Sequence, residues 1–278
     1  MSLFLCYDTY MEKNLSVIEY ISYDFYFLYL KKLSDEGITS NAWHEHSFYE
    51  IMYFDKGASE FVIENRRYEV KEGDVLLIKP GKHHFQRKIF DSENSLFCIG
   101  FHQDAIESHE MAKELFERGS HFSLSSDSGL SHLLLAAKEK LSKNKNESEI
   151  FVKAVCEAAI SILLDTDMKR EKSKQIKNDS VNKVIKFINE NLTEIQSTDD
   201  ITKALFFSES YLRAIFKREM GISVMQYVRN KKLLLADRML RNGKKPTVIY
   251  SECGFLNYSS FFRAYLSHFK VSPKARKL

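Results

Sequence analysis

The feature that most constrains the fold is a helical pattern that occurs twice in the last third of the chain. From Val181 onward, apolar residues recur at helical spacing with only short breaks. Two helix pairs, at 199–220 and 247–268, each combine a short helix, a tight turn and a longer helix that starts with Ser or Asn and carries basic residues. One long helix, at 223–241, joins the pairs. This internal repeat predicts an all-α domain.

The formal charge is divided unevenly along the chain. Residues 181–278 hold 18 Lys and Arg against 8 Asp and Glu, a net charge of +10, whereas residues 1–180 carry −7. A strongly basic domain next to an acidic one indicates a polyanionic partner for the basic end. Because a basic surface can also serve only to keep a domain soluble, the charge alone does not decide between these interpretations.

Residues 15–101 have the alternation and turn signals of β structure. The predicted strands cover 20–30, 50–54, 60–64, 67–70, 74–78 and 95–101. Many short strands in so short a stretch predict a small sandwich or barrel. Helical segments follow at 104–117, 131–142 and 149–167. The last of these is apolar almost all round, so it either packs on the barrel or pairs with its copy in a homodimer.

The charged stretch after these helices lacks periodicity and is interpreted as a linker. The sequence therefore predicts an α+β multidomain fold with an N-terminal domain over 1–168, a linker over 169–180 and the all-α domain over 181–278. Four scattered cysteines without a CxxC pair are typical of a reducing cytoplasm. The apolar run 20–30 is too short and too charged to span a membrane, so no membrane partner is expected.

Specific residues in the helical domain resemble a known family. Ser208–Lys217, Gly221–Ser223 and Tyr227 resemble the first half of the DNA-binding domain of AraC/XylS-type transcriptional regulators, which contains two helix-turn-helix units. The second half is matched by Gly254–Phe255, Ser259, Phe261, Arg263 and Ser272–Pro273. The second unit also departs from the family pattern: Tyr250 stands at a usual Ala, Tyr265 at a usual Phe and Lys270 at a usual Gly.

The resemblance implies which side chains meet double-stranded DNA. In a helix-turn-helix unit the second helix enters the major groove and its N-terminal residues contact base edges. The outward positions on the two second helices are Ser210, Arg213, Ala214 and Lys217, and Asn257, Ser259, Ser260 and Arg263. An arginine at such a position can bind guanine with two hydrogen bonds, whereas a lysine such as Lys217 more often meets phosphate.

Histidines near the N-terminus resemble the two short motifs of cupin barrels, which form the sensory half of many AraC-type regulators. The motifs comprise His44, His46, Glu50 and Gly57, then Gly73, Pro80–Gly81, His83 and His84. Imidazole and carboxylate ligands suit divalent transition metals, so His44, His46, Glu50 and one of His83 or His84 are a candidate metal set. Three interpretations remain open: metal-dependent catalysis, metal sensing or structural metal, and a metal-free effector pocket or structural cluster.

A set of aromatic residues is predicted to line the barrel interior, which suits a small organic effector as well as a plain core. These residues are Trp43, Phe48, Tyr49, Tyr53, Phe85 and Phe97. The sequence thus predicts a cytoplasmic, sequence-specific transcriptional regulator and not an enzyme. The cupin-like domain would bind an effector or form a homodimer, with no required cofactor. The resemblance further implies activation through RNA polymerase.

Two alternatives belong to other functional classes. The first is a metal-dependent cupin oxygenase or isomerase with an appended helical domain. The second is an adaptor that binds another protein through the barrel, and the strongly basic domain with two recognition helices argues against it.

Overall fold

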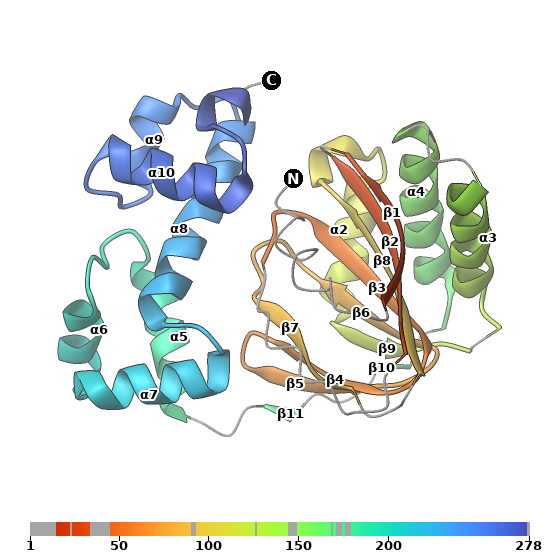
Figure 1. Cartoon of the computed structure of the whole chain (residues 1–278), viewed down its shortest axis with the longest axis horizontal. Coiled ribbons are helices and arrows are strands. Elements are labelled where there is room, and N and C mark those ends of the chain that lie inside the picture. The colour runs from red at the N-terminus through yellow and green to blue at the C-terminus, as the bar shows by residue number, and fades with distance from the viewer. Residues whose placement is uncertain are drawn as a thin grey trace. The chain divides into compact units, whose positions relative to one another are not determined.

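The computed structural model describes residues 15–22, 24–33, 45–89, 93–125, 127–143, 149–167, 169–170, 174–175 and 179–276. The chain divides into a β-rich unit that contains residues 48–174 and a helical unit that contains residues 175–278 (Figure 1). This division confirms the predicted α+β architecture. Among the described residues, no helix is both long enough and apolar enough to cross a bilayer.

Two antiparallel sheets make up the β-rich unit. The larger sheet has the strand order β1 (Leu15–Ile21), β2 (Phe25–Leu33), β8 (Glu93–Phe101), β3 (Tyr49–Lys56), β6 (Asp74–Ile78), β9 (His121–Ser123) and β10 (Lys169–Arg170). The smaller sheet has the order β11 (Lys174–Gln175), β5 (Arg66–Val70), β4 (Ser59–Ile63) and β7 (His84–Ile89). Two of these strands differ from the prediction, since the stretch 20–30 is divided between β1 and β2. Ser22 turns the chain there by hydrogen bonding with the backbone of Phe25.

Three helices cover one face of the larger sheet: α2 (His109–Arg118), α3 (Gly129–Lys143) and α4 (Glu149–Asp165) (Figure 1). A short 3-10 helix, η1 (Gln103–Ala105), leads into them. Their apolar residues join those of β2, β3 and β8 in one large core. Apolar side chains of α4 are fully buried in this core, so the helix packs on the sheet as one of the two predicted options requires.

The helix-covered face also takes up aromatic residues that were predicted to line the barrel interior. Tyr53 and Phe97 are buried in the core with the helices, and Tyr49 packs against it. That part of the prediction was therefore wrong, because successive residues of a strand point to opposite faces and β3 turns its odd-numbered positions toward the helices. Phe48 and Phe85 are buried as well, and Trp43 lies outside the described residues.

The predicted linker, 169–180, contains regular structure at three places. Lys169 and Arg170 form β10, which pairs with β9. Lys174 and Gln175 form β11, and residue 179 begins the next helix. Backbone groups at a sheet edge accept a further strand whatever its side chains are, so side-chain periodicity carries no signal for such pairing.

Among the described residues, six helices form the helical unit suggested by the repeat. They are α5 (Asp179–Asn191), α6 (Thr198–Leu205), α7 (Glu209–Met220), α8 (Val224–Arg241), α9 (Pro246–Glu252) and α10 (Tyr258–Phe269), followed by the 3-10 helix η2 (Pro273–Arg276). One core holds apolar residues between Val181 and Val228, and a second holds residues between Leu233 and Phe269. The predicted pairs correspond to α6–α7 and α9–α10, which α8 connects (Figure 1).

Local side chains set the ends of these helices. The N-cap of α6 is Ser197, which forms a capping box with Asp200, and Thr198 is the first helical residue. The two amides that donate to the Asp200 carboxylate, those of Gln196 and Ser197, lower the pKa of this group. Pro246 begins α9, where its missing N–H costs nothing.

Candidate DNA interface and barrel histidine cluster

The second helix of each pair begins with a side-chain cap. The hydroxyl of Ser208 accepts a hydrogen bond from the amide of Tyr211 at the start of α7. Asn257 plays the same part at the start of α10, where its Oδ1 lies 2.8 Å from the amide nitrogen of Ser260. These caps fix where each helix begins, and therefore which residues stand at the tip expected to enter a groove.

On α7 all four predicted contact residues are exposed. Leu212, Ile215 and Phe216 are buried beneath them, so the helix has one face in the core and one in solvent. The exposed set is Ser210, Arg213, Ala214 and Lys217. The structure therefore places these four residues on one free helix face, as the spacing predicts.

The guanidinium of Arg213 already has an acidic neighbour. Its Nε and Nη2 lie 3.0 Å and 2.5 Å from Oε1 of Glu209, one turn earlier on α7. Both side chains are largely exposed, so the pair is weak and can exchange Glu209 for another acceptor. The bond nevertheless holds the guanidinium near the tip of the helix, where a base edge or a phosphate would compete for it.

On α10 the predicted residues are less uniform. Asn257, Ser259 and Arg263 are exposed, but Ser260 is half-buried. Because Oδ1 of Asn257 is used by the helix cap, only its amide nitrogen remains to donate to DNA. Arg263 is thus the strongest candidate for base contact in the second unit.

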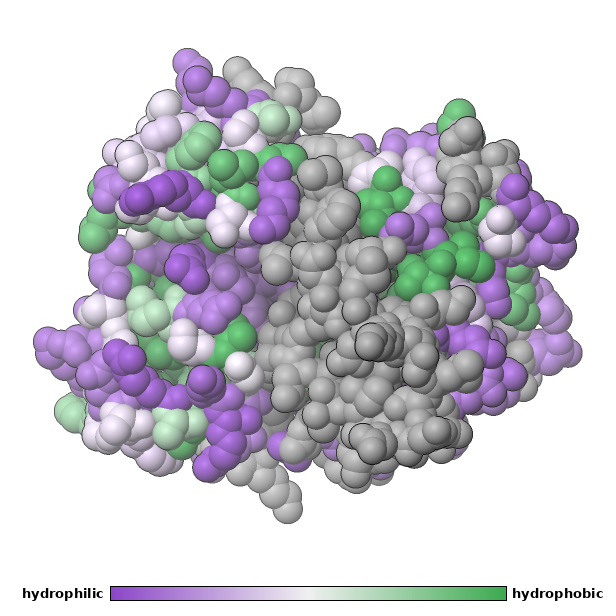
Figure 2. Space-filling model, viewed as in Figure 1, coloured by the Kyte–Doolittle hydropathy of each residue, from purple (hydrophilic) through white to green (hydrophobic). Residues whose placement is uncertain are grey.

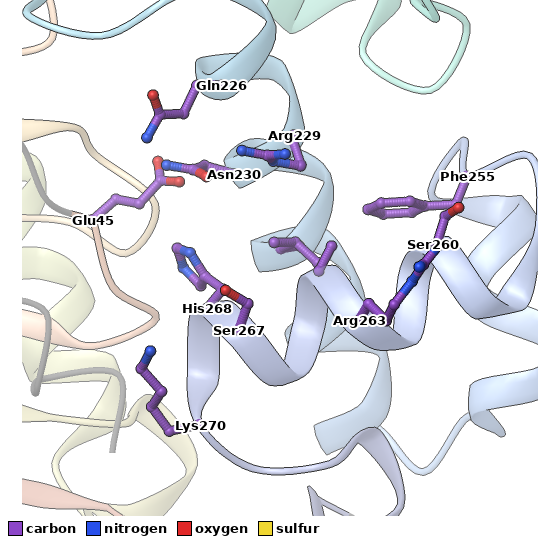
Figure 3. A pocket seen from close by; sticks show the side chains of 12 residues that line it. Glu45, Gln226, Arg229, Asn230, Phe255, Ser260, Arg263, Ser267, His268 and Lys270 are labelled. Atoms are coloured by element: carbon purple, nitrogen blue, oxygen red, sulfur yellow. The ribbon is translucent and has the colours of Figure 1, made fainter.

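A polar pocket opens between α8 and α10. Figure 3 shows Gln226, Arg229 and Asn230 of α8 lining it, together with Ser260 and Arg263 of α10. Ser267, His268 and Lys270 add further polar groups from the end of α10. The sequence analysis did not single out the residues of α8, because at helical spacing they look like an ordinary solvated face. In the view of Figure 2 the surface of this unit is mostly hydrophilic, with small apolar patches.

In the barrel the structure brings together three of the five predicted residues. Each of His46, Glu50 and His84 offers a ligand atom within 4.8 Å of the others, and all three are buried. Glu50 lies on β3 and His84 begins β7, so residues far apart in sequence meet on neighbouring sheets. His44 lies outside the described residues. His83 is also buried, and its backbone amide donates to Oε1 of Glu64; of the two adjacent histidines, His84 is the one that belongs to this cluster of described residues.

The contacts of His84 define its chemistry. Nδ1 lies 2.8 Å from the carbonyl oxygen of Lys82, which can only accept, so Nδ1 carries a proton. Nε2 lies 3.1 Å from Oε2 of Glu50. With the proton on Nδ1, the lone pair of a neutral imidazole stands on Nε2, the atom through which the ring would bind a cation. A carbonyl-oriented imidazole is also the usual arrangement of a metal-binding histidine.

Two further buried polar clusters gave no signal in the sequence. Asp74 on β6 lies 2.9 Å from Nε2 of His121 and also accepts from the hydroxyl of Ser123, both on β9. In the helical unit Lys232 of α8 reaches two backbone carbonyls. The partners in each cluster lie more than 20 residues apart along the chain, and their proximity depends on tertiary packing.

Two family descriptions match the chain. The description "AraC-like ligand binding domain" matches residues 35–160, and "Helix-turn-helix domain" matches residues 201–277. The first falls on the β-rich unit with its helices and the second on the helical repeat, so both domains were correctly identified from their motifs.

Similar proteins align with most of the chain. YbfI of Bacillus subtilis strain 168, an uncharacterized HTH-type transcriptional regulator, is 24% identical over 223 residues, which are 78% of this chain and 79% of the relative. The Msm operon regulatory protein of Streptococcus mutans is 23% identical over 233 residues, 82% of this chain and 84% of the relative. The crystal structure of ToxT from Vibrio cholerae covers 91% of this chain and 97% of its own, with 15% identity and a TM-score of 0.38.

Proposed function

Since this chain is a DNA-binding transcriptional regulator of the AraC type, with an AraC-like ligand-binding domain followed by a helix-turn-helix domain, we propose that one molecule recognises an asymmetric duplex site with α7 and α10. The observation that carries this proposal is the equivalence of the two helices. Each begins at a side-chain cap and presents an exposed arginine in its second turn, Arg213 five residues after Ser208 and Arg263 six residues after Asn257. Two such helices about 34 Å apart would enter successive major grooves on one side of the duplex.

The barrel is proposed to modulate this binding. An effector changes a regulator only when it binds two states with different affinity. The cluster of His46, Glu50 and His84 is the candidate site, because its two imidazoles and one carboxylate suit a divalent transition metal and Nδ1 of His84 is held by a carbonyl. An acidic or hydroxylated organic effector would use the same donors. In this proposal neither the metal ion nor the organic effector takes part in catalysis.

Two further partners belong to the proposal. Activation of transcription would require contact with RNA polymerase bound beside the operator. We expect the purified protein to raise the rate of transcription in vitro from the promoter of its own gene. Self-association is expected through the exposed apolar residues of the covering helices, Leu135 on α3 and Ile150 on α4. Sedimentation of the full-length protein, compared with that of the Ile150→Glu variant, measures this self-association. Because the proposed partner is chromosomal DNA, we also expect the protein to be cytoplasmic.

The test of DNA recognition begins with selection of duplexes from a random library by the full-length protein. Dissociation constants for the selected site and for a scrambled duplex are then compared over a series of salt concentrations. A specific regulator is expected to prefer its site by about a thousandfold or more. Arg213→Ala and Arg263→Ala should each reduce this preference by about 1–3 kcal/mol, the worth of a bidentate contact to one base pair.

The matched control is Arg118→Ala, which removes an exposed, ion-paired arginine from α2 in the barrel unit. It should leave both affinities unchanged. Equal binding of selected and scrambled duplexes with the same steep salt dependence would contradict sequence recognition, because it would show attraction to phosphate alone. If Arg213→Ala weakens binding to both duplexes by the same factor, Arg213 contacts the phosphate backbone of the DNA and not a base.

A further inference from the structure

A buried lysine connects the two helix-turn-helix units. Lys232 lies on α8 and only 5% of its surface is exposed. Its Nζ donates to the carbonyl oxygen of Ile195 at 2.6 Å and to that of Gly254 at 2.8 Å. Ile195 precedes α6 in the first unit, and Gly254 lies in the turn between α9 and α10 in the second. One ammonium group therefore holds a segment of each unit.

The position of Lys232 on α8 gives this contact its importance. Residues up to Val228 belong to the core of the first unit, and residues from Leu233 onward belong to the core of the second. Lys232 thus stands where α8 passes from one core to the other. A single helix between two separate cores can bend or twist, and the hydrogen bonds of Lys232 oppose such motion at the point where it would occur.

Neighbouring contacts support the same junction. Nε2 of Gln196 lies 3.1 Å from the carbonyl oxygen of Gly254 and is a second donor to it. Gly254 has a φ of +78°, and a Cβ built there would stand 2.1 Å from the carbonyl oxygen of Thr193. The turn of the second unit therefore lies directly against the loop of the first, at a distance that only glycine allows.

The energetics favour an intact junction. An ammonium group bonded to carbonyl oxygens forms charge-assisted hydrogen bonds, which are stronger than neutral ones. Burial lowers the pKa of Lys232, and the nearby Asp200 carboxylate acts in the opposite direction. A substitution that removes the ammonium would take one donor from each of the two carbonyls and leave that of Gly254 with Gln196 alone, and water entering between the units would most easily replace the lost hydrogen bonds.

We propose that Lys232 is a positioning residue that sets the distance and angle between α7 and α10, and with them the spacing of the two half-sites in DNA. The proposal rests on base contact by both helices, as proposed above. When two binding modules are held rigidly at the right span, the second binds as an intramolecular step. A loose junction reduces this advantage and tolerates more than one spacing, since a shift by one base pair moves a half-site by only about 3.4 Å.

The experiment uses the full chain and the duplex selected by it. Variants of that duplex have either half-site scrambled, or one base pair added or removed between the half-sites. For the wild-type protein the altered spacing should cost at least about tenfold in affinity. For Lys232→Met the penalty for altered spacing should fall below about threefold and the intact site should bind about tenfold more weakly, with the affinity for each isolated half-site unchanged. Lys232→Arg, which keeps the charge and the donors, should restore part of the penalty.

Lys186→Met serves as the control, because it removes an exposed lysine of α5 that pairs with Glu190. It should behave as the wild type. The proposal is overturned if Lys232→Met keeps the wild-type spacing penalty, or if it weakens binding to the isolated half-sites as much as to the intact site. If Lys232→Met does not fold, Gln196→Ala decides, and an unchanged spacing penalty in that variant overturns the proposal. A wild-type protein with no bipartite site at all would instead contradict the proposed function.

Discussion

The hydroxyl of Tyr265 on α10 donates a hydrogen bond to Oδ1 of Asp237, a fully buried carboxylate on α8. The second carboxylate oxygen accepts from Nε of Arg241 at 3.3 Å. Tyr265 is one of the positions where the chain departs from the pattern of its family, and the structure supplies the reason. A phenylalanine would fill the same core position but would lack the donor that Asp237 uses.

Tyr265→Phe is therefore expected to destabilise the helical unit by about 1–3 kcal/mol, because a buried carboxylate loses one of its hydrogen bonds. Denaturant unfolding followed by circular dichroism measures the change. Tyr250→Phe is the control, because it removes a hydroxyl from a ring that packs edge-on against Tyr258. Its free energy of unfolding should stay within about 0.5 kcal/mol of the wild-type value. Equal effects of the two substitutions would contradict the role assigned to the Asp237 bond.

Lys270→Gly is expected to stabilise the protein. Lys270 ends α10 with a φ of 59°, in the left-handed region, which costs a side-chain-bearing residue about 1–2 kcal/mol. Part of the gain is cancelled by the larger entropy of glycine in the unfolded chain, so a net gain of about 1 kcal/mol is expected. Lys245→Gly at a φ of −76° is the control and should give no gain. A midpoint of denaturation below that of the wild type would refute the prediction for Lys270.

Glu209→Gln is expected to raise DNA affinity. The substitution releases Arg213 from its ion pair and removes a negative charge from the tip of α7. Because exposed pairs are worth about 0.2–1 kcal/mol, affinity for the selected duplex should increase about two- to fivefold at fixed salt. Glu190→Gln on α5 breaks a comparable exposed pair with Lys186 and should have no effect. Weaker binding after Glu209→Gln would mean that this carboxylate itself orients the arginine for base contact.

Zn²⁺, Ni²⁺ or Co²⁺ is expected to raise the melting temperature of protein first treated with a chelator. A bound ion at a concentration of 100 times its dissociation constant stabilises the fold by about 2.7 kcal/mol. His84→Ala should abolish the shift, whereas His132→Ala, which alters an exposed histidine paired with Asp127, should not. If no metal raises the melting temperature and none is found by mass spectrometry, the cluster of His46, Glu50 and His84 is not a metal site.

The buried thiols are expected to be unreactive in the native protein. Burial raises the pKa of Cys253 to about 12, and it also raises the pKa of Cys156 far above its usual value. Since the thiolate is the nucleophile, neither should be alkylated at pH 8 before the chain unfolds. Site-resolved mass spectrometry after brief alkylation, with and without denaturant, tests this. Rapid native labelling of Cys253 would show that the second helix-turn-helix unit opens locally.

Periodicity made the helical unit predictable. Leu212 and Phe216, and Phe261 and Tyr265, stand at helical spacing in the sequence and lie in the two cores, because helical contacts repeat at short sequence distance. The barrel was predictable as a class but not in detail. The turn at Ser22 and the sidedness of Tyr53 depend on register and on which face the helices cover, and a strand pattern buried on both faces carries neither.

By itself, the sequence determined the two domains, the repeat of two helix-turn-helix units and the residues exposed on α7, since these follow from local propensity and helical period. Only the tertiary structure decided that His84 and not His83 lies beside Glu50 and that Tyr265 donates a hydrogen bond to Asp237. It also decided that Lys232 joins the two helix-turn-helix units. Each of these contacts joins residues 22 or more positions apart in the sequence. Such pairs form because buried polar groups must find partners, and the chain path rather than the local sequence determines which partner is within reach.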